Sequence, residues 1–226
     1  VIYDSRKDIR LAATGSASPI IEDASTDSGT GRWTVIKIPT LSFYEYCQLL
    51  QLDDMPLLPD HLKITDIPKM ENAEVADLMA RFEPLVKHFN RYLTIGGFPE
   101  LALSDDDLYA QRMLREDVVD KVIKRDVLTL FKVRSPLLME KLFLYLCMNS
   151  TEIFSATTAA KELDNISPNT IESYVDALVK SNLIYMAYPI AVGSKSVLKG
   201  RPKIYIADAA IRNAVLMVDD VLSDER

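Results

Sequence analysis

The sequence predicts an α+β protein in which a short α/β segment is followed by a mainly helical region. Three observations support this prediction. Two apolar, strand-like runs, at 9–13 and 34–38, flank a polar loop near the N-terminus. Apolar residues then recur at helical spacing through much of 72–148. Two short helical segments finally precede two further strand-like runs, at 183–188 and 203–206.

Prolines and changes of pattern divide the chain. Pro56, Pro59 and Pro68 lie close together, so the segment that contains them is expected to be an extended linker. We expect it to separate the α/β segment from the rest. The expected parts, in order, are the α/β segment 1–52, the linker 53–70, a helical domain 71–150, a C-terminal domain 151–210 and a tail 211–226.

The first strand-like run ends in Thr14-Gly15-Ser16. Polar side chains at the carboxyl end of a strand lie where open α/β sheets bind their ligands. Thr14 and Ser16 are therefore candidate ligand-sensing residues. A turn that only ends the strand would have the same sequence, and this alternative stays open.

The helical region is predicted to contain one long amphipathic helix. Ser104 with the acidic residues 105–107 is expected to cap it. One face of the helix carries an apolar stripe at spacings of four, four and three residues, made of Val119, Ile123, Val127 and Leu130. Residues 137–147 are apolar on nearly all sides and predict a central core helix.

The C-terminal part has the pattern of a winged helix. Ser155 is expected to cap a helix that ends at Leu163, and Ser167-Pro168 to start a second helix. Two strands then follow, joined by the polar loop 193–201. Helix, turn, helix and a two-stranded wing is the winged-helix plan.

Winged helices often bind DNA through the second helix, which here starts at Ser167-Pro168. Tyr174 on this helix could contact DNA together with the polar residues near it. The DNA- or partner-binding candidates are Asn169, Thr170 and Ser173 on this helix and Lys195, Lys199, Arg201 and Lys203 on the wing. The helix also carries Glu172 and Asp176 against Lys180, which disfavours phosphate binding. A solvated wing on a protein-binding module is the alternative.

Composition excludes several classes of function. A net charge of -7 gives no overall attraction to nucleic acid or anionic membranes. Cys47 and Cys147 lack the spacing of zinc ligands, so no metal site is expected. We expect both to be reduced thiols in a cytoplasmic protein. The longest apolar run, 184–192, is far shorter than the roughly twenty residues that span a bilayer. His61 and His88 lie in no nucleophile motif.

Four short motifs follow one another along the chain: LSFYEY at 41–46, LTIGGFPE at 93–100, VIKRDV at 122–127 and PKIYIAD at 202–208. With the TGS and GR that precede them, they make the chain resemble prokaryotic AAA-type (P-loop) ATPases. The C-terminal half of those proteins is a domain of unknown function with a winged helix. The resemblance implies that the α/β segment is the remnant of a P-loop ATPase core.

The resemblance also implies roles for three residues. Thr14 and Ser16 would form the sensor-1 segment, which orients the attacking water or contacts the γ-phosphate. Arg32 would be an arginine finger that stabilises charge on the nucleotide of a neighbouring subunit, which implies a homo-oligomer. An ordinary surface arginine is the alternative for Arg32.

The chain contains no Gly-x-x-x-x-Gly-Lys-Ser/Thr loop to cradle phosphates and no strand ending in paired acids to hold Mg2+. We therefore expect a C-terminal fragment of a longer ATPase. ATP and Mg2+ would bind in the full-length protein, and this chain alone would bind neither and be inactive. The alternative is a non-catalytic winged-helix module that binds DNA or protein.

Overall fold

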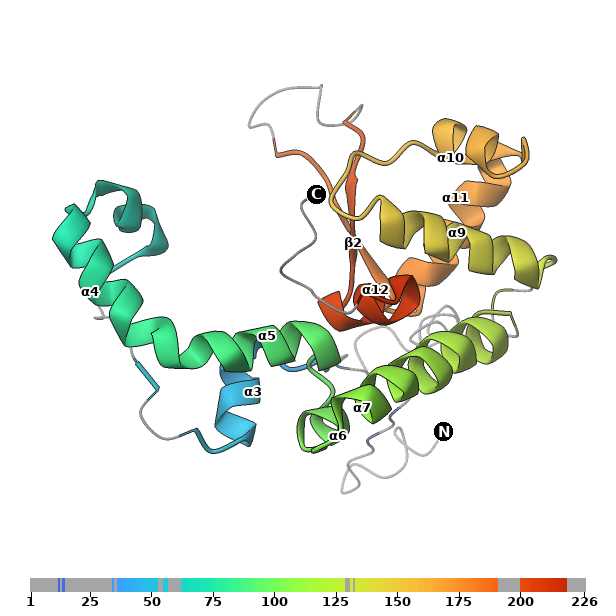
Figure 1. Cartoon of the computed structure of the whole chain (residues 1–226). Helices are drawn as coiled ribbons and strands as arrows, with labels where there is room; N and C mark the ends of the chain where they lie inside the picture. The colour runs from blue at the N-terminus through green and yellow to red at the C-terminus, as the bar shows by residue number, and fades with distance from the viewer. Residues whose placement is uncertain are drawn as a thin grey trace, which may run out of the picture.

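The computed structural model describes residues 12, 14, 34, 36–52, 55–56, 62–128, 131, 133–190 and 200–218, without the side chains of 118, 125 and 126. These residues are mostly helical and include one small antiparallel sheet (Figure 1), which confirms the α+β class. Among them, no helix is both long enough and apolar enough to cross a membrane.

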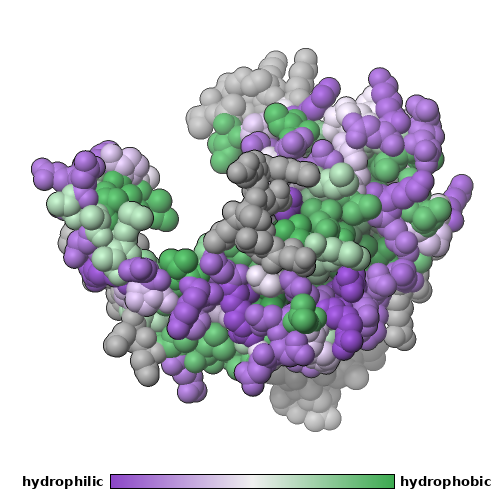
Figure 2. Space-filling model, in the orientation of Figure 1, coloured by the Kyte–Doolittle hydropathy of each residue, from purple (hydrophilic) through white to green (hydrophobic). Residues whose placement is uncertain are grey.

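The first half of the described fold is helical. Its elements are α3 (Phe43–Leu49), η2 (Ile64–Lys69), α4 (Asn72–Phe82), η3 (Glu83–Leu85), α5 (Val86–Ile95), α6 (Pro99–Ala102), α7 (Asp107–Met113), η4 (Leu114–Asp120) and η5 (Val122–Val127). Short helical segment η2 and helix α4 project away from the body of the molecule as an arm (Figure 1). Apolar residues gather on the side of the arm that faces the body (Figure 2).

The second half contains the sheet. Its elements are α9 (Pro136–Met148), α10 (Ala156–Glu162), α11 (Pro168–Lys180), β1 (Ile184–Ala187), β2 (Lys203–Ile206) and α12 (Ala209–Leu216). Buried residues from α3 to α12 form one continuous apolar cluster. The domain limits at 52, 70 and 150 stay predictions.

The strand predicted at 34–38 is absent from its described residues. Residues 34 and 36–38 have no regular structure, and Ile36 and Ile38 are 79% and 90% exposed. A strand is held by hydrogen bonds to a neighbouring strand, and no described residue provides one here. Most of the strand predicted at 9–13 lies outside the described residues.

The long helix is present, but its start differs from the prediction. Asp106 caps α7, because its Oδ1 accepts a hydrogen bond from the Tyr109 amide at 2.9 Å. Ser104 instead accepts from the Asp106 amide, in the turn before the cap. The helix continues through the π-helical turns η4 and η5. The described members of the stripe, Val119, Ile123 and Val127, are buried as predicted.

Helix α9 is the predicted core helix, but only one side of it is buried. Ser135 caps it through a hydrogen bond from the Leu138 amide. Its buried residues are Met139, Leu142, Phe143, Leu146 and Cys147. Leu137, Leu144 and Met148 are exposed on the remaining surface. An apolar run without a polar face predicts burial on all sides, but it cannot show which sides have neighbours.

The C-terminal helices and strands follow the predicted order. Ser155 caps α10 by accepting from the Thr158 amide, while Ser167 takes the cap position of α11 without a side-chain hydrogen bond. Strands β1 and β2 pair antiparallel. Segment 151–154 pairs with the other edge of β2, through hydrogen bonds such as Thr151 N to Ile204 O at 2.7 Å. The sequence did not predict this third extended segment.

Helix α12 begins just before the predicted tail and lies at the centre of the molecule (Figure 1). Asn213 donates a hydrogen bond to the Leu93 carbonyl of α5 at 3.0 Å. Arg212 donates to the Cys147 carbonyl of α9 at 3.1 Å. Helix α12 therefore ties the two halves of the fold together, and residues 211–216 are core rather than tail.

Candidate functional site

Three of the four sequence motifs meet at one place, which we call the junction. It consists of Leu41–Tyr46, Arg91–Phe98 and Asp208. The Leu41 amide donates to the Gly97 carbonyl at 2.7 Å, and the Gly97 amide donates to Asp208 Oδ2 at 2.9 Å. Two backbone groups of one glycine thus connect segments that are far apart in the sequence. The side chains of Arg125 and Asp126, in the fourth motif, lie outside the described part.

Asp208 holds two backbone amides with one carboxylate. Its side chain is only 7% exposed. Oδ1 accepts from the Ala210 amide at 2.9 Å and so caps α12, while Oδ2 accepts from Gly97. Asp208 is therefore the N-cap residue of α12. Its second bond, to the glycine loop, makes the start of α12 depend on the position of α5.

The two glycines are required by geometry. Gly96 has φ 80° and ψ -174°, a region that residues with a side chain avoid. A Cβ at Gly96 would lie 2.7 Å from Asp208 Oδ1. A Cβ at Gly97 would lie 2.2 Å from the Leu41 carbonyl oxygen. The Gly-Gly pair therefore permits a close approach between three segments.

Helix α3 is fixed at its start by a capping box. The Ser42 amide donates to Glu45 Oε2 at 2.8 Å, and the Glu45 amide donates to Ser42 Oγ at 3.3 Å. The hydrogen bond from the Ser42 backbone, aided by the one from its hydroxyl, lowers the pKa of Glu45. The Ser and Glu of LSFYEY therefore have a structural role.

An aromatic cluster attaches α3 to α5. The ring centroids of Phe43 and Tyr92 are 5.5 Å apart, and those of Tyr46 and Tyr92 are 5.3 Å apart. Phe89 packs edge-on against Phe43 at 5.1 Å. The Tyr92 hydroxyl donates to the Leu41 carbonyl at 2.8 Å. Such ring pairs each contribute roughly 0.5–1.5 kcal/mol beyond their buried area.

Arg91 fixes the other side of the junction. Its Nε lies 2.9 Å from Asp107 Oδ1, and its Nη1 donates to the Tyr46 hydroxyl at 2.9 Å. The same guanidinium also donates to the Ala102 and Ser104 carbonyls. Burial raises the pKa of Tyr46 even though Arg91 opposes the shift, so this phenol is neutral at neutral pH.

The junction joins three segments of the chain through hydrogen bonds. Its described polar side chains are engaged by backbone groups or by one another, as the bonds of Asp208, Tyr92 and Arg91 show. The described residues hold no cluster of His, Cys, Asp and Glu that could bind a metal ion. We find here a fixed attachment of α3 to α5 and α12, with no nucleophile beside a base.

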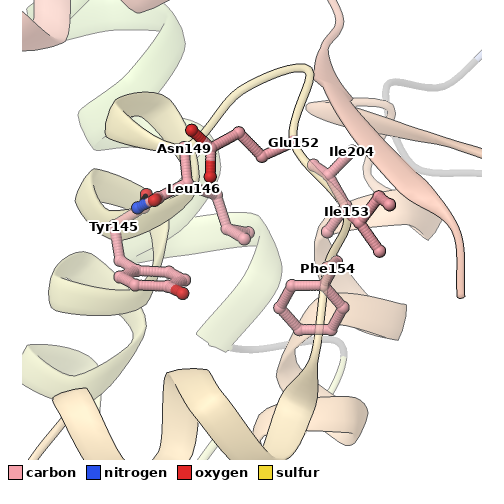
Figure 3. A pocket seen from close by; sticks show the side chains of 7 residues that line it. All are labelled: Tyr145, Leu146, Asn149, Glu152, Ile153, Phe154 and Ile204. Atoms are coloured by element: carbon pink, nitrogen blue, oxygen red, sulfur yellow. Dashed lines mark hydrogen bonds between the residues drawn. The ribbon is translucent and has the colours of Figure 1, made fainter.

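A small cavity lies between α9, segment 152–154 and β2 (Figure 3). Its volume is about 20 Å³. It is lined by Tyr145, Leu146, Asn149, Glu152, Ile153, Phe154 and Ile204. This space holds about one water molecule and no larger ligand.

The structure places only some of the predicted site residues. Thr14 is exposed, whereas Ser16, Arg32, Lys195 and Lys199 lie outside the described residues. The sensor and arginine-finger roles therefore stay predictions. Arg201 and Lys203 are exposed where the wing enters β2.

On α11, Asn169 and Ser173 are exposed and Thr170 is half-buried. Tyr174 is buried, and its hydroxyl accepts from the Ser135 amide at 3.1 Å, so it is a packing residue rather than a DNA contact. Asp176 forms a 2.9 Å ion pair with Lys180. The exposed side of α11 is therefore polar and not basic.

Both cysteines are fully buried. Burial raises the pKa of Cys147 from an ordinary value of 9.0 to about 12, although nearby Arg212 opposes the shift. Because the pKa of this thiol is higher in the folded than in the unfolded state, the thiol contributes stability below about pH 9, and this contribution is lost as the pH rises toward 12.

We expect a thiol reagent at pH 8 to label Cys147 only when the protein unfolds in urea. Rapid labelling of the native protein would contradict this prediction.

Comparisons with known proteins give relatives without a described activity. The chain is 23% identical over 206 residues to an uncharacterized protein of Haemophilus influenzae. The aligned region covers 89% of this chain and 44% of that protein. It is 24% identical over 201 residues to an uncharacterized protein of Methanocaldococcus jannaschii. That aligned region covers 86% of this chain and 40% of the relative. The chain thus spans less than half the length of these relatives. No solved structure matches it.

One protein family matches the chain directly. The match covers residues 86–222, from the start of α5 to beyond α12. It includes the glycine loop and Asp208 of the junction, but not Leu41–Tyr46. Since it extends over more than half of the sequence, the chain belongs to the family described as domain of unknown function DUF8612.

Proposed function

We propose that the chain is the C-terminal part of an ATP-hydrolysing AAA-type ATPase, and that the junction transmits movement of the ATPase core to the C-terminal domain. The observation that carries this proposal is the convergence of three motifs on one mechanical connection. Leu41 follows the predicted sensor and arginine segments in the chain, and it bonds directly to the glycine loop that Asp208 holds.

The exposed residues before α3 support the proposal. Ile36 and Ile38 lie on either side of Lys37, so in a strand both would project from the same face. Both are largely exposed here, as expected for a segment whose sheet partners would belong to the longer protein. The greater length of the relatives leaves room for such a core.

The nucleotide would be bound mainly outside this chain. Its sequence has no phosphate-cradling loop, so ATP and Mg2+ would be held by residues elsewhere in the longer protein. Thr14 and Ser16 would contribute polar groups near the γ-phosphate. Arg32 would offer its guanidinium to the nucleotide of a neighbouring subunit.

We further propose that α9 to β2 form a winged helix that binds a partner. The order α9, segment 151–154, α10, α11, β1 and β2 fits this plan, with β2 between its two neighbours. DNA is the second candidate partner, and exposed Arg201 and Lys203 favour it. Glu172, exposed on α11, favours a protein partner instead.

The test is ATP turnover by the longer protein, by this chain alone and by the longer protein with Arg32→Ala. We expect turnover by the longer protein, none by this chain, and a loss on the order of a thousandfold or more from Arg32→Ala. Arg134→Ala, at an exposed arginine before α9, is the matched control and should retain turnover. If the longer protein neither binds nor hydrolyses ATP, the ATPase proposal is wrong and the binding module becomes the working function.

A further inference from the structure

We propose that the outer face of the sheet binds single-stranded nucleic acid. We call this surface the wing face, and it consists of Ile153, Tyr185, Arg201, Lys203 and Tyr205. The proposal does not depend on ATP hydrolysis, because it requires only the pairing of β1, β2 and segment 151–154.

The wing face is built around a pair of tyrosines. Tyr185 and Tyr205 lie directly opposite each other in the register of β1 and β2. Directly opposed residues project from the same face of a sheet, with Cβ atoms about 4.5–5.5 Å apart. Tyr185 is 47% exposed and Tyr205 38%, whereas their neighbours Ile184 and Ile204 are buried in the core. The pair therefore places two partly exposed rings on one face of the sheet.

Cations lie beside this pair. Lys203 precedes Tyr205 by two residues on β2, so both side chains project from one face. Ile153, 64% exposed, is the residue paired with Lys203 on the other side of β2. Arg201, also exposed, lies two residues before Lys203. No salt bridge to another described residue occupies either cation.

The acidic residue next to this surface on segment 151–154 projects away from it. Glu152 is adjacent to Ile153, so strand alternation turns it to the opposite side. The wing face thus has a positive local charge in a chain whose net charge is -7.

This combination favours single strands. Exposed aromatic rings stack on unpaired bases, and neighbouring cations attract the phosphates between them. In a duplex the bases are already stacked on one another, so the two exposed rings have no free base to stack on. The acidic residues on α11 also oppose the deep approach to a duplex groove that a recognition helix needs. A protein partner would gain little from two adjacent cations unless it were acidic.

The test uses this chain and a fluorescein-labelled 12-nucleotide oligo-dT or oligo-rU, with binding followed by fluorescence anisotropy at low salt. We expect binding, and we expect Tyr185→Ala and Tyr205→Ala each to weaken it by about five- to a hundredfold. Tyr185→Phe and Tyr205→Phe keep the rings and should retain binding even if the alanine variants fold poorly. Lys203→Gln should reduce the slope of log K against log salt concentration by about the amount that one phosphate contact contributes.

Tyr109→Ala is the matched control. Tyr109 is an exposed tyrosine on α7 that packs against Arg112 at 5.6 Å, away from the sheet. Binding should be unchanged in this variant. The proposal is overturned if the oligonucleotides do not bind, or if Tyr109→Ala weakens binding as much as Tyr185→Ala. Tighter binding of a duplex of equal length, lost in Asn169→Ala or Ser173→Ala, would overturn it in favour of a conventional recognition helix.

Discussion

Gly97→Ala is expected to destabilise the protein by about 3 kcal/mol or more, because the added methyl would overlap backbone rather than a side chain that could rotate away. The new Cβ would lie 2.2 Å from the Leu41 carbonyl oxygen and 2.7 Å from the Leu41 amide nitrogen. Either α3 must move off α5 or the Leu41–Gly97 hydrogen bond must break. Urea unfolding followed by far-UV circular dichroism measures the loss.

Gly96→Ala should give a related result for a different reason. An alanine at position 96 would have to adopt the φ and ψ angles of Gly96, which costs about 1–3 kcal/mol for a residue with a side chain. Its Cβ would also lie too close to the Asp208 carboxylate. Ser173→Thr, which adds one methyl to an exposed position on α11, is the control and should stay within about 0.5 kcal/mol of the wild type. Wild-type stability in Gly97→Ala would show that the Leu41 contact is absent in solution.

Asp208→Ala is the second substitution with a large expected effect. It removes the acceptor from two amides, those of Gly97 and Ala210, at a site that is nearly closed to water. Each buried donor left without a partner costs about 1–3 kcal/mol, so for two donors we expect a total of about 2–6 kcal/mol in urea unfolding. Asp208→Asn keeps one acceptor oxygen and should lie between the wild type and the alanine variant.

Asp105→Asn provides the matched control for Asp208. Asp105 is exposed in the turn before α7, so the same chemical change should alter stability by less than about 0.5 kcal/mol. Equal effects at the two positions would mean that Asp208 does not hold the two amides. Because the carboxylate joins α12 to the glycine loop, its loss should also weaken the protection of α12 in amide hydrogen exchange.

Local features of this fold could be predicted from the sequence. The Ser155 cap, the start of α11 at Pro168 and the two C-terminal strands depend on residues close together in the chain. The buried stripe of Val119, Ile123 and Val127 follows from helical spacing alone. These features have local causes, so they are readable without knowledge of the fold.

The contacts that matter most at the junction could not be predicted in the same way. The motifs were recognised as landmarks, but nothing local indicates that Leu41, Gly97 and Asp208 form one set of hydrogen bonds. The tyrosine pair on the sheet was missed for a related reason, since strand register decides which distant residues lie opposite each other. Consecutive glycines after a helix were the one available signal of a close backbone approach.

The α/β segment shows another limit. Its apolar run at 34–38 predicts a strand, yet a strand forms only where another backbone can pair with it. The described residues 34 and 36–38 have no such neighbour. An apolar run indicates what a segment can form, and the rest of the fold decides whether that structure forms.

The most direct test of the central claim is amide hydrogen exchange at the junction in the longer protein, with ATP and with ADP bound. If the junction transmits the state of the nucleotide, the peptides that contain Leu41–Tyr46 and Gly96–Phe98 should exchange at different rates in the two states. The arm residues of α4 should change less, since none of them is buried against the rest of the fold. ATP hydrolysis with identical exchange at the junction in both states would contradict the account.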